Sequence, residues 1–82
     1  MVNVEFASHL AKALDSRGTS LEATSVRQLL KALSKQYGAP FDERVKVCKV
    51  IVNGTSVAFL QGKGTPLHDG DRVVILPPVA GG

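Results

Sequence analysis

The sequence predicts an α+β fold in two layers, in which one main helix packs against one mixed sheet of about four to five strands. Three observations lead to this prediction. Strand-like segments stand near both ends, at residues 2–6 and 72–76, one amphipathic helix lies between them, and Asn53-Gly54 marks a hairpin. The 82 residues suffice for one modest core, so we expect one domain in which the last strand returns beside the first.

The N-terminal segments predict a hairpin. Residues 2–6 alternate apolar and polar side chains, which is the period of a strand with one buried face. Residues 8–18 fit a helix and a loop with a short turn equally well, because only three apolar residues have helical spacing. Residues 19–23 are a weaker strand pattern with Leu21 as its inward residue. Together the two strands would form a hairpin.

Residues 25–37 carry the clearest helical pattern of the chain. Ser25 and Gln28 have the spacing of a capping box, and Gly38 stands where a helix is expected to end. The apolar residues that fall on one face of this helix are Val26, Leu29, Leu30 and Leu33, with Tyr37 extending it.

The second half of the chain predicts three further strands. Ala39-Pro40 prevents the helix from continuing, and a polar connection of uncertain form follows at residues 41–46. Asn53-Gly54 is the strongest two-residue hairpin signal, and it separates two strand-like runs. The expected segments are a strand at 49–52, a return strand at 55–59, a loop at 60–70 and a last strand at 72–76.

The composition excludes several classes of function. The net charge of +3 comes from scattered basic residues with no interleaved aromatic platform, so we expect no nucleic-acid partner. No apolar run approaches the roughly 20 residues that span a bilayer, and the first residues do not resemble a secretory signal. The single cysteine, Cys48, cannot form an internal disulfide, which is typical of a reducing compartment. We therefore expect a cytoplasmic protein without a membrane partner.

Few interior residues suggest chemistry. His9 and His68 are far apart and have no third ligand at a recognisable spacing, so we expect no bound metal. Asp69 and Asp71 flank Gly70, and the chemistry of a turn accounts for both without a catalytic pair of carboxylates.

Cys48 allows two interpretations. Lys46 and Lys49 are close enough in sequence to lower the pKa of its thiol, but a small, half-buried apolar residue in a strand is the favoured interpretation.

The C-terminal end is the most informative segment for function. Two glycines have no side chain to bury and lose much backbone entropy on ordering, so they contribute little to a fold. They can instead thread a narrow channel of another protein and present the α-carboxylate of Gly82. We therefore divide the chain into a domain, residues 1–76, and a flexible tail, residues 77–82. The residues expected to thread are Pro77, Pro78, Val79, Ala80 and Gly81.

The segments 50–54 and 69–82 together resemble the MoaD/ThiS family of ubiquitin-like sulfur carriers, and within it most closely the small subunit of molybdopterin synthase. The resemblance rests on the Asp-Gly-Asp turn, the apolar strand, Pro-Pro-Val and the final Gly-Gly, while residues 7–18 and 60–65 match weakly. It implies a ubiquitin-like β-grasp fold. It also implies that an E1-like enzyme adenylates the carboxylate of Gly82 and that sulfur then converts it into a thiocarboxylate.

In the family the sulfur acceptor for molybdopterin synthesis is the large subunit of the synthase, and ATP and metal belong to the activating partner. The resemblance thus implies a chain that binds no cofactor itself and is not an enzyme alone. Sulfur carriage for cysteine or thiamine synthesis, or conjugation to target lysines through Gly82, remain alternatives because these roles share one tail. We expect Phe59 and Leu76 to end two strands near the root of the tail and to dock partners, unless both are core residues.

Overall fold

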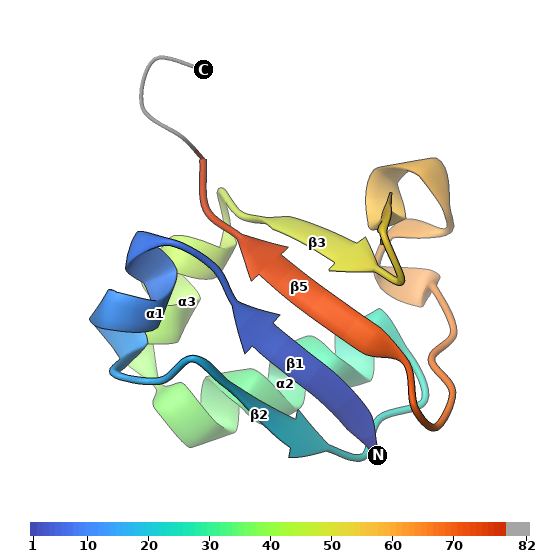
Figure 1. Ribbon diagram of the computed structural model, residues 1–82, viewed down its shortest axis with the longest axis horizontal. Helices are drawn as coiled ribbons and strands as arrows, with labels where there is room; N and C mark the ends of the chain where they lie inside the picture. Colours follow the sequence, from blue (N-terminus) through green and yellow to red (C-terminus); the bar gives the residue numbers. More distant parts are fainter. Residues whose placement is uncertain (79–82) are drawn as a thin grey trace.

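The chain folds into one five-stranded mixed sheet with its helices on one side, as the computed structural model shows for residues 1–78 (Figure 1). The strand order is β2-β1-β5-β3-β4, with β1 and β5 parallel and the other neighbours antiparallel. The strands are β1 Val2–Phe6, β2 Gly18–Leu21, β3 Lys49–Val52, β4 Thr55–Ser56 and β5 Arg72–Leu76. The predicted two-layer fold and the return of the last strand beside the first are confirmed.

β1 and β2 form the predicted hairpin, in which Val2 pairs with Leu21 and Glu5 with Gly18. The connection between them contains α1 (His9–Leu14), so the segment that fitted both helix and loop is helical. Gly18 permits the close approach of the two strands. A Cβ atom at this position would stand 2.1 Å from the carbonyl oxygen of Val4.

α2 (Val26–Tyr37) is the main helix, and its capping is close to the prediction. The hydroxyl of Ser25 accepts a hydrogen bond from the backbone N–H of Gln28 at 3.2 Å. The side chain of Gln28 accepts in return from the backbone N–H of Thr24 at 2.6 Å, one residue earlier than in a regular capping box. Val26, Leu29 and Leu33 are buried, and Gly38 follows with a φ of 71°.

The connection after α2, whose form the sequence left open, is a helix. α3 (Ala39–Val45) begins directly after Gly38 and carries Pro40 in its first turn, where the missing N–H of proline costs no hydrogen bond. Phe41 is buried and its ring lies 6.5 Å from that of Phe6. Burial of this single aromatic side chain, which local sequence does not reveal, stabilises the helix.

The predicted return strand at 55–59 is also too long. β4 ends at Ser56, and the chain turns into a 3₁₀ turn, η1 (Val57–Phe59), in which the hydroxyl of Ser56 accepts from the N–H of Ala58. The hairpin turn itself is as predicted, with positive φ angles of 48° at Asn53 and 89° at Gly54. A second 3₁₀ turn, η2 (Gly62–Gly64), lies in the predicted loop.

The core lies between the sheet and the helices. Its fully buried members come from β1, β5 and all three helices, so the sheet and the helices share one core, as expected for a single small domain. They include Val2, Leu10, Val26, Leu29, Leu33, Phe41, Val73 and Ile75. None of the helices in the described part of the chain has the length and apolar character that crossing a membrane requires.

Candidate functional site

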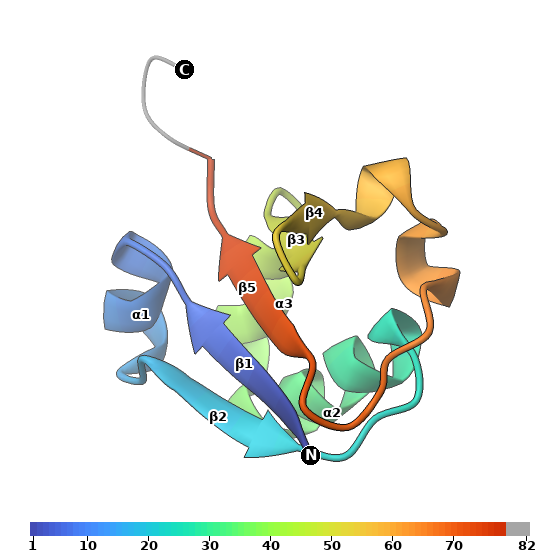
Figure 2. The same ribbon diagram turned by 45° about the vertical axis from the view of Figure 1, so that its right-hand side comes forward.

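The end of β5 is the place where the chain leaves the sheet, and neighbours hold it on both sides (Figure 2). The carbonyl of Ile75 accepts a hydrogen bond from the N–H of Ala7 at 3.1 Å. On the other side Leu76 pairs with Lys49 of β3. β5 is therefore a central strand whose last residues are fixed by β1 and β3.

The two prolines after β5 differ in their surroundings. Pro77 is buried, whereas Pro78 is exposed. The predicted domain boundary places Pro77 in the tail, and this boundary stays a prediction. The chain thus enters solvent at Pro78, with the preceding residue held in place.

The sheet face opposite the helices carries an apolar patch beside this exit. It consists of Ile51, Val74 and Leu76, which are half-buried, and Ile51 pairs directly with Val74. Arg72 and Glu5 lie on the same face and approach each other to 3.6 Å. An apolar centre with a charged border is the usual composition of a protein-docking surface.

Among these residues, only Leu76 is predicted from the sequence to dock a partner. Ile51 and Val74 could have been found from the alternation of strands, because Val50 and Val52, and likewise Val73 and Ile75, face the core. A strand that is apolar at every position has apolar side chains on both faces, and the outward ones are candidates for contact.

Phe59 does not lie at the end of a strand, where the sequence predicts it. Its side chain is 84% exposed, but it belongs to η1 rather than to the end of a strand. β4 precedes it at the outer edge of the sheet and is separated from β5 by β3. The structure therefore does not bring Phe59 and Leu76 together at the exit of the chain, and the docking role of each stays a prediction.

The residues predicted to carry the chemistry lie outside the described residues. They are Val79, Ala80, Gly81 and Gly82. The assignment of Gly82 as the reacting residue remains a prediction, and the structure contributes the position from which these residues depart.

Cys48 matches the favoured interpretation of a half-buried apolar residue. Its Sγ donates a hydrogen bond to the carbonyl of Arg44 at 3.1 Å, and burial raises the pKa of the thiol. The proposed lowering by Lys46 and Lys49 is therefore wrong. A raised pKa keeps the sulfur protonated and poorly nucleophilic.

The two histidines belong to separate elements, and the turn before β5 is held by hydrogen bonds of Asp71. His9 begins α1 and His68 precedes the turn into β5, and residues 1–78 contain no group of three His, Cys, Asp or Glu side chains placed to hold a metal. Asp71 accepts a hydrogen bond from the backbone N–H of His68 at 2.8 Å and one from the amide of Asn53 at 3.1 Å. These bonds lower the pKa of Asp71, the His68 bond most strongly.

A five-stranded mixed sheet with this order, one main helix across it and a central last strand that leads out of the domain defines a ubiquitin-like β-grasp protein. The chain belongs to the ThiS family, whose model matches residues 4–82. This family comprises ubiquitin-like sulfur carriers and modifiers that work with partner enzymes.

Two curated proteins are similar in sequence. A putative sulfur carrier protein of Archaeoglobus fulgidus is 34% identical over an alignment of 68 residues, and the match covers 74% of this chain and 77% of that protein. Small archaeal modifier protein 3 of Haloferax volcanii is 54% identical over 33 residues, which are 40% of this chain. The matched part spans only 36% of the length of the Haloferax protein.

Solved structures share the whole fold. Small archaeal modifier protein 1 of Methanosarcina acetivorans has a TM-score of 0.86 and 26% identity, covering 99% of this chain and 95% of that one. A complex of subunits 1 and 2 of the molybdopterin-converting factor of Helicobacter pylori contains a chain with a TM-score of 0.73 and 27% identity, covering 99% and 97%. The predicted β-grasp fold is thus confirmed.

Proposed function

We propose that this protein is a sulfur carrier whose Gly82 carboxylate becomes a thiocarboxylate and donates sulfur in the biosynthesis of molybdopterin, the organic part of the molybdenum cofactor. The observation that carries the proposal is the family match, which extends over residues 4–82 and so includes Gly81 and Gly82. The similarity to the molybdopterin-converting complex of Helicobacter pylori supports the choice of pathway.

The chemistry requires activation by a partner. A carboxylate is a poor electrophile, and an E1-like enzyme that transfers AMP from ATP to Gly82 supplies the missing leaving group. A donor persulfide then attacks the acyl carbon and releases AMP, and a thiol cleaves the resulting S–S bond to leave the thiocarboxylate. ATP and its metal are bound by the activating enzyme, while this chain binds no cofactor and is not an enzyme alone. We place these steps in the cytoplasm, where the ATP pool is available.

The fold suits such a carrier because the end of β5 is rigid while the reacting group stands several residues beyond it. The N–H of Ala7 and the pairing of Leu76 with Lys49 hold the strand end, and Pro77 is buried. Pro78 restricts the next backbone φ angle, which reduces the entropy lost when the tail enters a channel. Residues 78–82 could reach about 16 Å in extended form.

The patch of Ile51, Val74 and Leu76 supplies the docking surface in this proposal. It lies on the sheet face from whose central strand the tail departs, so a partner that covers it can receive the tail at the same time. The E1-like enzyme and the large subunit of molybdopterin synthase would bind it in turn, since both must act on Gly82.

A second candidate function is that of a protein modifier joined to target lysines through Gly82. Two similarities favour it, those to the archaeal modifier proteins of Haloferax volcanii and Methanosarcina acetivorans. Sulfur carriage for cysteine or thiamine synthesis shares the same activation and differs only in the acceptor.

The test is intact mass spectrometry after incubation with the cognate activating enzyme, ATP and a sulfur donor. We expect the full chain to gain the mass difference between one sulfur and one oxygen atom, and variants with Gly82 deleted or followed by extra residues to gain nothing. A mass gain in the Gly82-deleted chain would refute the assignment.

Loaded carrier mixed with the molybdopterin synthase large subunit and its pterin precursor should then lose its sulfur. If the carrier keeps its sulfur in this mixture but forms isopeptide-linked products with lysine-containing targets, the protein is a modifier instead.

A further inference from the structure

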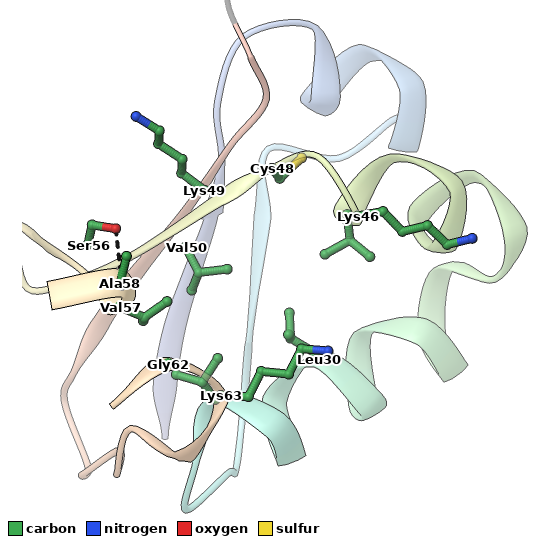
Figure 3. Close-up of a pocket in the computed structure, with 12 residues that line it drawn as sticks. Leu30, Lys46, Cys48, Lys49, Val50, Ser56, Val57, Ala58, Gly62 and Lys63 are labelled. Carbon is green, nitrogen blue, oxygen red and sulfur yellow. Dashed lines mark hydrogen bonds between the residues drawn. The ribbon is translucent and has the colours of Figure 1, made fainter. Parts of the chain in front are cut away.

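Lys49 borders the apolar patch of Ile51, Val74 and Leu76 beside the point where the chain leaves the sheet. Exposed and buried positions alternate along β3, so Lys49 and Ile51 lie on the outward face of the sheet and Val50 lies on the core face. In Figure 3 the side chain of Lys49 accordingly points away from Val50 and from the cavity that Val50 lines. Because Lys49 pairs with Leu76, the two are neighbours across the strands on the same face.

Arg72 borders the patch at its other end. It lies on the outward face like Val74, which stands two positions further along β5, and it lines a hollow of this face together with Ile51 and Val74. The Cα atoms of Lys49 and Arg72 are about 14 Å apart, from a rise of about 3.3 Å per residue and a strand spacing of about 4.8 Å. The two cations therefore offer separate positions for negative charge, with the apolar patch between them.

One acidic residue stands beside these cations. Glu5 of β1 pairs with Val74, and its carboxylate approaches the guanidinium of Arg72 to 3.6 Å. Both side chains are more than half exposed, at 55% for Glu5 and 68% for Arg72, and an exposed pair of this kind contributes little to stability. Arg72 can therefore exchange Glu5 for a carboxylate of a partner at small cost. A further arginine, Arg17, lines the hollow that Glu5 and Arg72 share, so positive charge exceeds negative charge at this border.

The arrangement fits a protein partner that has acidic groups around an apolar contact. The apolar centre favours a protein over a nucleic acid, because a nucleic acid needs a continuous basic groove with aromatic side chains for its bases. A second copy of the chain would bring one excess of positive charge against the same excess. The E1-like enzyme is the partner that sulfur carriage and protein modification have in common, so we assign the face to this enzyme.

We propose that the E1-like enzyme places carboxylate side chains at two positions around its contact with the apolar patch, one against Lys49 and one against Arg72. The pair at Lys49 lies beside the start of the tail, and the pair at Arg72 fixes the rotation of the domain about the patch. Glu5 opposes the second pair, because its charge has the same sign as that of the partner. This inference rests on the proposed function, since it concerns the enzyme that activates Gly82.

The test measures the dissociation constant of the full chain for its cognate E1-like enzyme by biolayer interferometry. Lys49→Gln and Arg72→Gln each remove one positive charge from an exposed side chain, and each should weaken binding about fivefold. Glu5→Gln removes the opposing charge and should strengthen binding about twofold to threefold. Raising the salt concentration from about 0.1 M to about 1 M should reduce all three differences, because salt screens charges at an exposed border.

Lys31→Gln is the matched control. It removes the same charge from an exposed position of α2, on the other side of the sheet, and should leave binding within about twofold. Thermal melts of each variant check that the fold persists. Equal effects of Lys31→Gln and Lys49→Gln, weaker binding of Glu5→Gln, or unchanged binding of both Lys49→Gln and Arg72→Gln would overturn the proposal. A free chain that forms a dimer which Glu5→Gln dissociates would also overturn it, because the face would then bind a second copy.

Intact mass keeps this test separate from that of the proposed function. A chain that gains sulfur while its binding ignores these charges is a carrier without the acidic contacts, so this inference alone fails. A chain whose binding follows the charges but that gains no sulfur has the acidic contacts and is not a sulfur carrier.

Discussion

Asp71 links three separate segments, and its replacement by asparagine tests how the start of β5 is held. Its carboxylate accepts from the backbone N–H of His68 at 2.8 Å and from the side-chain amide of Asn53 at 3.1 Å. Asn53 in turn accepts from the N–H of Arg72 at 3.0 Å, so the β3–β4 turn is fastened to β5 through this residue. The side chain of Asp71 is only 17% exposed.

The expected loss of stability follows from these two bonds. Asp71→Asn keeps the shape of the side chain but replaces one carboxylate oxygen by an NH₂ group. This group faces a donor that the oxygen accepted from, so one charge-assisted hydrogen bond is lost and two donors face each other. We expect a decrease in the free energy of unfolding of about 1 to 2 kcal/mol. For a domain of this size that corresponds to a fall in melting temperature of about 5 to 15 °C.

The effect should depend on pH with a definite sign. The two hydrogen bonds hold the pKa of Asp71 below its ordinary value of 3.8. Between the lowered and the ordinary pKa the unfolded chain binds a proton that the folded chain does not, so stability rises with pH in this range. The contribution of Asp71 is therefore complete above the ordinary pKa and is lost as the pH falls through the lowered one.

Thermal melts of the full chain and of Asp71→Asn, followed by circular dichroism from about pH 7 down to about pH 2, measure this effect. The difference between the two melting temperatures should be largest near neutral pH and should shrink below about pH 4. Glu22→Gln is the matched control, because Glu22 is exposed and forms no hydrogen bond or ion pair within residues 1–78. A difference that is absent at pH 7, or that stays constant down to pH 2, would refute the reasoning.

Three further variants test the core, the hairpin and the thiol. Phe41→Ala should lower the free energy of unfolding by about 3 to 5 kcal/mol because the ring of Phe41 is fully buried. Phe59→Ala is the control and should change it by less than about 0.5 kcal/mol. Similar urea midpoints for the two variants would contradict the placement of α3. Gly18→Ala should lower the free energy of unfolding by about 1 to 3 kcal/mol, because the new Cβ meets the carbonyl of Val4. Gly64→Ala is the control, because a Cβ at that position has open space. An unchanged melting temperature of Gly18→Ala would show that β2 can shift freely. Cys48→Ser should keep its hydrogen bond to Arg44 and be thiocarboxylated at the rate of the full chain, and a folded variant without that activity would point to a thiol relay.

The sequence predicted those elements whose signals are local. β1 and β5 have the predicted bounds, and α2 differs by one residue, because alternation in a strand and the Ser25 cap are readable within a few positions. The Asn53-Gly54 turn likewise contains its own backbone preference. The family assignment also came from contiguous motifs, and the same motifs name Gly82 as the candidate reacting residue.

Elements that depend on distant neighbours were not predictable in this way. α3 forms where a polar connection was expected because Phe41 packs against Phe6 of β1, 35 positions earlier in the chain. β4 ends at Ser56 and the chain continues as η1, so Phe59 belongs to a 3₁₀ turn instead of to a strand that ends at the root of the tail.

The sequence by itself therefore determined the fold class, the main helix, the order of the strands along the chain and the residue on which the proposed chemistry depends. Only the tertiary structure decided that Ile51 and Val74 form one patch with Leu76 and that Pro77 is buried. The physical reason is that helix caps, turns and strand alternation act between residues a few positions apart. Burial and surface patches arise instead when the sheet brings together segments that are far apart in the chain.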